Sequence, residues 1–562
     1  MTSPRVDIPF DRYHDYDALT EHLSALATAF PKLMKLESIG TTHRGRDVWA
    51  VTLTNPDTGP ESDKPGFYLD AQIHAEEHAT SAVALYAVWH LLHAYGEDEE
   101  VTRLLDGQAV YVLPRINPDG AEYALQPPFF PWCGNGRFAP GEERETGLIP
   151  SDLDGDGYIT TMRVPDPKGE WKKSEQDPRL MVQRAPGEEG GEYYRLYPEG
   201  AIRDYDGAHV VIEKPRDGNL NRNFPANWSN VEYGAFESAL SEPESRAVAR
   251  FILDRPNIAG MNAYNMHGGL ILRPSMTPPD ETRPPRDLSL YEEIGKVGES
   301  LTGYPTVSIY EEFTPDKSKP RHGGLMDWTY EQMGIVSFGT EVWDLEREAG
   351  VEKTAYYNLH PRDDETQAKV FAWVLENVGE HGFRDWTPFE HPQLGPVEVG
   401  GMVYIWTYRN PPPALLQQLC HDNVRFCVRH ALAAPRLQID EVDARQLADG
   451  LYEVRAVVAN HGYLPTNLTD VALERELAVP VEVELKAGDE AELESVATVE
   501  IGHLAGRNER RFPWSPWGPE WTANAVPVTW IVRASAGTSL EVEARSERGG
   551  VARATVAVRP ES

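Results

Sequence analysis

Hydrophobic and polar positions alternate in two different rhythms along this chain, and the change between them comes near residue 386. Before it, apolar runs rich in β-branched and aromatic residues predict buried strands. These runs are 46–55, 66–74, 108–116, 259–267, 305–310 and 334–343. Leu19, Leu23 and Leu26 recur at helical spacing, and similar patterns predict helices at 79–95, 286–301 and 366–378. Residues 1–385 are therefore expected to form one α/β domain with a largely buried sheet.

Two stretches interrupt or follow this rhythm. Residues 124–218 are rich in Pro, Gly and Glu and carry no long periodic run, which predicts an insertion into the α/β domain. Residues 386–434 are Pro- and Gly-rich at first and then helical, which predicts a linker and a short helix. From 435 to 562 short segments alternate with a period of two residues between Gly, Asn and Asp turns, which predicts an all-β sandwich.

Composition narrows the class of partner. The chain has 562 residues, 89 acidic against 53 basic, and a formal net charge of −36. Such a negative surface argues against nucleic acid and anionic membrane as partners. Three cysteines are too few for a disulfide framework. No signal-peptide pattern and no membrane-length apolar run is seen, so a soluble, cytoplasmic protein is expected. The oligomeric state is not predicted.

The chemistry starts at His74-Ala75-Glu76-Glu77-His78, which follows an apolar strand run. In one hypothesis the segment is helical, so that His74 and His78 bind zinc and Glu77 is the base. In the other, His74 ends a strand and Glu77 begins a helix, so that these two bind the metal and His78 does not. A third interpretation places all three at a turn without a metal, with the acids favoured by the helix dipole. The apolar run directly before His74 favours the strand-end hypothesis.

A catalytic zinc needs three protein ligands and one open position. His267, at the end of another predicted strand and before two glycines, is the best candidate for the third ligand. Glu341, at the exit of an apolar strand, is the candidate general base, because a carboxylate there is costly to bury without a purpose. Asn221 and Arg222 lie in a turn-rich segment and offer an amide and a guanidinium fork suited to a carboxylate.

In order along residues 10–380, these pieces resemble the zinc carboxypeptidases of the carboxypeptidase A family. The segments that carry the resemblance are "ESIGTTHRGRDV", the His74-x-x-Glu77 pair, "NPDG" at 117–120, "NLNRNF" at 219–224, His267, "GGLMDWTYEQMG" at 323–334 and "SFGTEV" at 337–342. The resemblance implies a mixed, mostly parallel sheet with helices on both faces. It also implies an exopeptidase that acts on peptides with a free C-terminal carboxylate.

The resemblance further assigns roles to residues. Zinc is held by His74, Glu77 and His267 with water as fourth ligand, and Glu341 deprotonates that water and passes the proton to the leaving amine. Asn221 and Arg222 bind the C-terminal carboxylate of the substrate.

Four positions depart from the family pattern or match it less directly. Glu76 stands where the family usually has an arginine. Arg137 is the nearest match to the arginine that polarises the carbonyl, and Tyr310 to the mobile tyrosine, although it lies farther upstream than the family spacing. Met326 matches the position that often sets side-chain preference, and it indicates an apolar or permissive pocket and a neutral C-terminal residue.

Within the insertion, Asp152, Asp154 and Asp156 reproduce the first half of a calcium-binding loop. The acid expected at the twelfth position is replaced by Arg163, so a structural calcium and a plain acidic turn both remain open.

Three functions are consistent with the sequence. The favoured one is a zinc-dependent metallocarboxypeptidase that hydrolyses the C-terminal peptide bond. The alternative is a related zinc amidohydrolase for a non-standard amide, such as a cell-wall peptide or an acyl-amino acid. The third is a non-catalytic binding module, which the presence of His74, Glu77, His267 and Glu341 disfavours.

Overall fold

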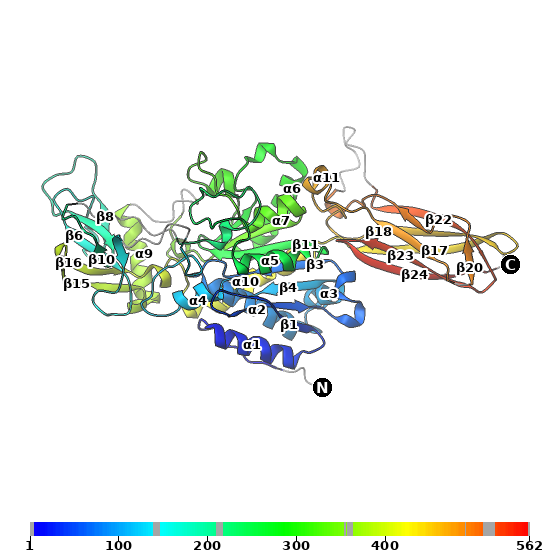
Figure 1. The fold of residues 1–562 in the computed structure, drawn as a ribbon, viewed down its shortest axis with the longest axis horizontal. Helices are drawn as coiled ribbons and strands as arrows, with labels where there is room; N and C mark the ends of the chain where they lie inside the picture. The colour runs from blue at the N-terminus through cyan, green and yellow to red at the C-terminus, as the bar shows by residue number, and fades with distance from the viewer. Residues whose placement is uncertain are drawn as a thin grey trace.

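The computed structural model describes residues 5–138, 146–208, 217–352, 356, 363–488, 490–509 and 523–559. These residues form three units along the long axis of the molecule (Figure 1). A central α/β body lies between a smaller β-rich unit at one end and a β-sandwich at the other.

The central body is built on one eight-stranded sheet. Its order is β1 (Met34–Thr41), β2 (Asp47–Leu53), β4 (Ala109–Leu113), β3 (Gly66–Asp70), β11 (Ile258–Met266), β14 (Val336–Val342), β12 (Leu270–Arg273) and β13 (Thr306–Ser308). β4, β3, β11 and β14 run parallel to one another, as do β12 and β13. β1, β2 and the β12–β14 contact are antiparallel. The expected mixed, mostly parallel sheet is confirmed.

Helices cover both faces of this sheet, as the resemblance implied. One face packs against α1 (Tyr16–Ala29), α2 (His78–Ala94), α3 (Glu99–Gly107), α9 (Asp364–Asn377) and α10 (Pro413–Ala431). α6 (Pro285–Thr302) continues this layer beside α10. The other face packs against α5 (Pro243–Leu253) and α7 (Leu325–Met333). Every residue of β3, β4, β11 and β14 is buried, because helices exclude water from both sides.

Several elements differ from the pattern-based expectation. The "NPDG" stretch, expected to be a turn, begins the helix α4 (Pro118–Ala124). Asn117 caps this helix, since its side chain accepts a hydrogen bond from the Gly120 amide, and Pro118 occupies the first helical position. α3, α5, α7 and β12 were not predicted; they are short, with 9, 11, 9 and 4 residues.

The insertion forms strands and joins a segment far along the chain. Its strands are β5 (Gly147–Pro150), β6 (Thr161–Pro165), β7 (Trp171–Lys173), β8 (Met181–Gln183), β9 (Tyr194–Pro198) and β10 (Gly200–Arg203). β5 pairs with β10, while the other four share a six-stranded sheet with β15 (Phe383–His391) and β16 (Gly395–Met402). This sheet is the β-rich unit at one end of the molecule (Figure 1).

Residues 386–434 therefore do not behave as the expected linker and short helix. β15 and β16 complete the sheet of the insertion, and the 19-residue α10 packs its buried side against α2 and α6. The Pro- and Gly-rich composition gave no sign of these strands. β16 pairs with the adjacent β15 on one side, but its other partner is β6, more than 200 residues earlier. Pairing between such distant segments leaves no local sequence signal.

The expected C-terminal sandwich is confirmed. One sheet contains β17 (Leu437–Ala448), β18 (Leu451–Asn460), β22 (Ala525–Ala534) and β20 (Ala491–Leu493). The other contains β21 (Thr498–Glu500), β19 (Glu482–Lys486), β23 (Ser539–Ser546) and β24 (Gly550–Ala557). All strand pairs are antiparallel, and the fully buried Trp530 lies in the core between the two sheets.

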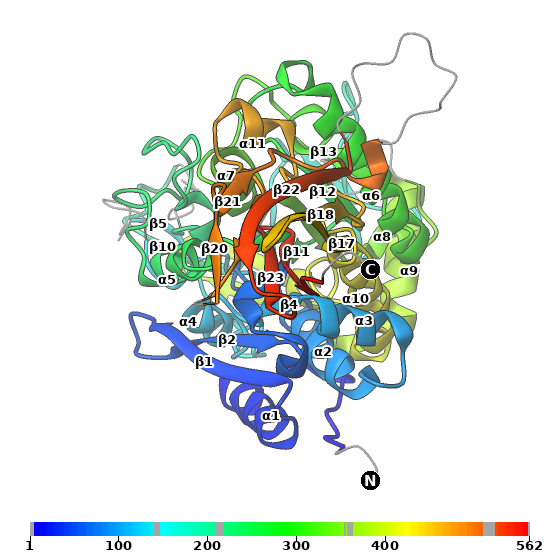
Figure 2. The same cartoon turned by 90° about the vertical axis from the view of Figure 1, so that its right-hand side faces the viewer.

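The sandwich contacts the central body through a short excursion from its sheets. α11 (Asp470–Glu474) packs against α6 and α7. The buried carboxylate of Asp287 on α6 accepts hydrogen bonds from the amides of Asp470 (2.7 Å) and Val471 (3.2 Å). Figure 2 views the molecule from this end, with the sandwich in front of the central body.

Short helices complete the described chain. They are α8 (Leu345–Glu348), η1 (Pro56–Thr58), η2 (Glu61–Asp63), η3 (Leu220–Arg222), η4 (Asp280–Thr282), η5 (Ile309–Phe313), η6 (Gly379–His381), η7 (Tyr404–Trp406) and η8 (Arg507–Glu509).

Candidate active site

Three neighbouring parallel strands end at the same edge of the central sheet, and the predicted site residues follow those ends. β3 ends at Asp70, and His74 lies in the loop after it. His267 directly follows β11, and Glu341 on β14 is the register partner of Asn265 on β11. Because the carboxyl ends of adjacent parallel strands form the usual ligand crevice of α/β sheets, this edge is the candidate site.

His74 is outside the helix that follows it. α2 begins at His78, and Glu77 is its N-cap residue, so His74 and His78 do not share a helix face. His78 is buried and its Nδ1 lies 2.8 Å from Nε2 of Gln72. Its ring also stacks on Trp406 at a centroid distance of 5.8 Å. The helical two-histidine hypothesis is thus wrong, and the strand-end hypothesis agrees with the local structure.

His74 and Glu77 are in direct contact. Nδ1 of His74 lies 2.9 Å from Oε1 of Glu77, while Oε2 of Glu77 is buried without a hydrogen-bond partner. Burial raises the pKa of Glu77 and of Glu341, and the nearby Glu77 carboxylate adds to the rise at Glu341. Glu77 and Glu341 are buried acids near each other, and one oxygen of Glu77 has no hydrogen-bond partner, so a cation would stabilise this group.

Two imidazoles and one carboxylate form a donor set that suits zinc, with room for a fourth ligand. His74 and Glu77 supply two of these donors, and His267 follows the neighbouring strand. By the chemistry of their donor atoms, these residues therefore fit a zinc ion. Within the described part of the chain, however, the three-donor groups whose ligand atoms lie within 4.8 Å of one another are two others: His43–Glu242–Glu244 and Asp152–Asp154–Asp156. Zinc at His74, Glu77 and His267 stays a prediction.

A small cavity of about 60 Å³ joins several predicted residues. His74, Glu341, Asn221 and Arg222 all line it. Its remaining wall is mostly apolar and includes Leu272, Met276, Ile309, Phe313, Leu325 and Met326. The position of Met326 in this wall agrees with the expectation of an apolar pocket.

Asn221 and Arg222 are fixed in place at the cavity by local contacts. They lie on η3, and Oδ1 of Asn221 accepts a hydrogen bond from the Leu325 amide at the start of α7 (3.1 Å). Nη1 of Arg222 donates to the backbone oxygen of Asn221 (2.7 Å), and its side chain is 11% exposed. Burial lowers the pKa of Arg222 to about 10, and the positive charge of Arg321 contributes to the same shift.

Arg321 is a cavity residue that the sequence analysis missed. It lines the same cavity as Arg222, is half-buried, and its guanidinium lies 5.3 Å from the centre of the Phe313 ring. It stands two residues before Gly323-Gly324, where the sequence analysis looked farther upstream for a tyrosine. A cation next to that glycine pair was the available signal.

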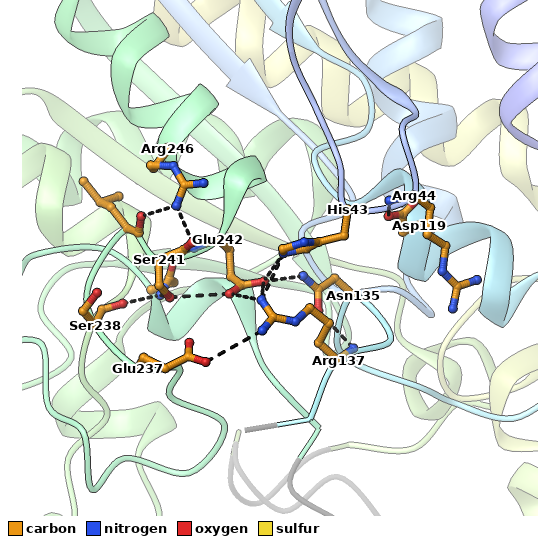
Figure 3. Close-up of polar contacts among 12 residues, drawn as sticks. His43, Arg44, Asp119, Asn135, Arg137, Glu237, Ser238, Ser241, Glu242 and Arg246 are labelled. Carbon is orange, nitrogen blue, oxygen red and sulfur yellow. Dashed lines mark hydrogen bonds and ion pairs between the residues drawn. The ribbon is translucent and has the colours of Figure 1, made fainter. Parts of the chain in front are cut away.

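The structure does not bring Arg137 and Tyr310 into this cavity. Nη1 of Arg137 lies 2.8 Å from Oε1 of Glu242 and 3.0 Å from Nε2 of His43 (Figure 3). Tyr310 lies on η5, whose Ile309 and Phe313 line the cavity, but Tyr310 itself is not among the lining residues. Arg137 is instead paired with the buried carboxylate of Glu242.

The acidic loop of the insertion has a compact shape. Ligand oxygens of Asp152, Asp154 and Asp156 lie within 4.8 Å of one another. Asp152 accepts hydrogen bonds from the amides of Gly155 and Gly157, and Asp156 forms an ion pair with Arg384 at 2.6 Å. These contacts give the carboxylates of Asp152 and Asp156 hydrogen-bond and charge partners without an ion, so structural calcium stays a prediction.

The comparisons with known proteins match this arrangement. The family model "Zinc carboxypeptidase" matches residues 19–367, more than half of the chain. The chain belongs to the zinc carboxypeptidase family. A second model, described only as a domain of unknown function, matches residues 436–557, the sandwich.

Curated relatives of this zinc carboxypeptidase family member are similar over part of their length. Carboxypeptidase D of Drosophila melanogaster is 29% identical over 423 residues, which cover 70% of this chain and 23% of the relative. A zinc carboxypeptidase of Saccharothrix mutabilis subsp. capreolus is 29% identical over 131 residues, covering 22% of this chain and 30% of the relative. The inactive metallocarboxypeptidase ECM14 of Saccharomyces cerevisiae is 33% identical over 119 residues, covering 21% and 27%. The chain thus spans less than a third of the length of these relatives.

Solved structures with a similar chain trace include thrombin activatable fibrinolysis inhibitor, at 18% identity and a TM-score of 0.39, covering 66% of this chain and 76% of that one. Carboxypeptidase A from Helicoverpa armigera is 19% identical with a TM-score of 0.39, covering 67% and 75%.

None of the helices in the described ranges is both long enough and apolar enough to cross a membrane.

One further site residue lies outside the segment that the family model matches. Arg409 follows η7, and its Nη1 donates to the backbone oxygen of Met266, the residue before His267 (3.2 Å). Its Nε lies 3.7 Å from Oε1 of Glu76. The sequence analysis missed Arg409 because it had placed the surrounding residues in a linker.

Proposed function

We propose that this chain is a zinc-dependent carboxypeptidase that hydrolyses the last peptide bond of peptides with a free C-terminal carboxylate. The observation that carries the proposal is the single cavity lined by His74, Glu341, Asn221 and Arg222. His74, the proposed metal ligand, and Glu341, the proposed base, line the same cavity as an amide and a guanidinium that suit a terminal carboxylate, and this supports the proposal. Membership in the family supports the same activity.

Each side chain has a distinct role in this proposal. His74, Glu77 and His267 would hold the zinc ion, which when bound supplies a Lewis acid for the scissile carbonyl. Glu341 takes a proton from the attacking water and gives it to the leaving amine. Asn221 and Arg222 bind the terminal carboxylate and so set which bond lies beside Glu341.

Arg321 adds a second positive charge to the carboxylate-binding end. Arg222 and Arg321 line one cavity, and two guanidinium groups near each other are stabilised when an anion lies between them. We propose that the substrate carboxylate is this anion. Arg321, rather than Tyr310, then completes the binding site.

The decisive experiment is mass spectrometry of a mixed peptide library incubated with the protein, with and without a zinc chelator. The expected result is the loss of single C-terminal residues, which the chelator abolishes. The Glu341→Gln variant should lower turnover by about 10²–10⁴-fold, because glutamine cannot accept the proton. It should leave the bound zinc and the melting temperature unchanged, since Glu341 is not among the proposed ligands.

Two results would redirect the assignment. If the protein holds one zinc ion per chain but shortens no peptide, the related amidohydrolase activity on a non-standard amide replaces it. If the protein binds no zinc, the ligand assignment is wrong and the binding-module hypothesis leads, as the similarity to a relative described as inactive would allow.

A further inference from the structure

The segment from Thr407 to Asn410 lies beyond the region matched by the family model, yet it contacts all three strand ends of the candidate site. The backbone oxygen of Thr407 accepts a hydrogen bond from Nε1 of Trp343, which directly follows β14 (2.7 Å). The ring of Tyr408 lies 6.1 Å from the ring of His267, centre to centre. A segment remote in sequence therefore contacts residues at or next to the proposed metal ligands.

Asn410 holds the loop after β3. Its Oδ1 accepts a hydrogen bond from the Ala79 amide in the first turn of α2 (3.0 Å), and its Nδ2 donates to the backbone oxygen of Glu76 (2.8 Å). Both contacts are fully buried. The backbone around Glu77 is thus fixed on both sides by one amide side chain.

Arg409 connects this loop to β11. Nη1 donates to the oxygen of Met266, next to His267, while Nε lies 3.7 Å from Oε1 of Glu76. The side chain of Glu76 is only 4% exposed, whereas that of Arg409 is 32% exposed, so a buried carboxylate has a partly exposed cation as its charge partner. A buried carboxylate that loses such a partner must find another cation.

Glu76 and Glu77 are adjacent acids on one short loop, so either one could in principle be the carboxylate ligand of the metal. Glu77 contacts His74, whereas Glu76 is held by Arg409. Each has one carboxylate oxygen that is buried without a hydrogen-bond partner. Either acid has an oxygen to offer a metal ion. Arg409 approaches the other oxygen of Glu76, Oε1, and so restrains the orientation of that carboxylate, whereas Glu77 is placed beside His74.

We propose that Arg409 is a positioning residue that holds Glu76 away from the metal, so that Glu77 alone joins His74 and His267, with Asn410 fixing the loop. This inference rests on the proposed zinc site. It assigns a role in the active site to a segment that follows the family domain. Contacts around a metal's ligands of this kind fix ligand orientation, and their loss costs affinity or activity.

The test compares Arg409→Gln with Arg409→Lys in the full-length chain. We expect Arg409→Gln to weaken zinc affinity, measured by competition with a chelator, and kcat by about 10–100-fold, with little change in KM. Arg409→Lys keeps the charge beside Glu76 and should recover most of both losses. Equal defects in the two variants would overturn a role that depends on charge.

Arg384→Gln is the matched control. Arg384 has a side chain 30% exposed, against 32% for Arg409, and is also paired with one acid, Asp156. It lies in β15, away from the cavity, so its replacement should leave zinc affinity and kcat unchanged. Melting temperatures of all variants show whether a loss reflects unfolding instead.

The double variant Glu76→Gln with Arg409→Gln tests the mechanism directly. If Arg409 acts by restraining Glu76, removing that acid should relieve most of the Arg409→Gln defect in zinc affinity and kcat. Losses that multiply in the double variant would overturn the inference. A wild-type protein that binds no zinc overturns the proposed function and this inference together. Normal wild-type binding with an unaffected Arg409→Gln overturns this inference alone.

Discussion

The expected role of Arg222 and Arg321 in binding a carboxylate follows from their position at the small cavity. Both guanidinium groups line the small cavity, and Arg222 is nearly buried beside a backbone oxygen that it also contacts. Arg222 is nearly buried and Arg321 is half-buried, and the carboxylate of Glu232, 3.7 Å from Nε of Arg222, offsets part of their charge. A further anion in the cavity would offset the rest. The terminal carboxylate of a peptide offers that charge.

We expect Arg222→Gln and Arg321→Gln each to raise KM for a free-acid peptide by about 10–100-fold, in line with about 1.5–3 kcal/mol for hydrogen bonds to charged groups. Peptides with an amidated C-terminus serve as the control. They should be poor substrates for the wild type and lose little more with either substitution. An equal loss on free-acid and amidated peptides would show that the arginines do not bind the carboxylate.

Which histidine faces the site could be predicted from a few residues, but which arginine does so could not. The apolar run before His74 argued for a strand end, and α2 begins only at His78. Arg137 was chosen by its order in the sequence, yet the buried Glu242 holds it. Long flexible side chains follow the charges around them, and those come from the fold.

At the scale of elements, the turn between β9 and β10 carries a buried acid. The carboxylate of Glu199 accepts hydrogen bonds from the amides of Leu153 and Thr160, and the side chain is fully buried. Burial raises the pKa of Glu199 from 4.5 to about 7. The folded chain therefore keeps this proton at pH values where the unfolded chain has released it.

The sign of the resulting pH dependence follows from the raised pKa. The stabilisation is complete below about pH 4.5 and is lost as the pH rises through about 7. Between pH 5 and 8 the melting temperature of the wild type should fall relative to that of Glu199→Gln, whose side chain stays neutral. Replacing Glu390 on β15, which is exposed, should leave the pH profile unchanged. Parallel profiles for wild type and Glu199→Gln would contradict the prediction.

Strands of the α/β body and the sandwich could be predicted because each carries its own apolar pattern. The sheet of the insertion could not, since its strands are short and one of its longest partners, β16, comes from a segment that looked like a linker. The local pattern of apolar residues predicts which face of a strand is buried, but it does not predict which distant strand pairs with it.

At the scale of the whole molecule, we propose that the catalytic unit extends past residue 385. β15 and β16 complete the insertion's sheet, and α10 fills a groove of the central body beside α2 and α6. The sandwich from about 435 onward remains a separate unit with its own core. It contacts the body through α11, through ion pairs of Arg545 and Arg553 with Asp63, and through a hydrogen bond from Arg548 to the backbone oxygen of Met333.

Asp287 is the buried residue at the α11 contact of this junction. Its buried carboxylate accepts hydrogen bonds from the amides of Asp470 and Val471 and from the hydroxyl of Tyr330 (2.8 Å). Asp287→Ala leaves these donors unsatisfied and should lower the free energy of unfolding by about 2–4 kcal/mol. Asp470→Ala removes only a partly exposed ion pair with Arg286, so calorimetry should show a much smaller loss. Similar losses would show that Asp287 does not hold the junction.

The sequence by itself determined the α/β body, the sandwich, and the strand-end placement of His74, His267 and Glu341, because strand periodicity and chain order are local properties. Only the tertiary structure decided that Arg321 lines the cavity, that Arg137 is held by Glu242, and that the segment ending at Asn410 closes around the site. Those outcomes depend on contacts between residues far apart in the chain. Their energies come from burial and paired charge, which no single stretch of sequence contains.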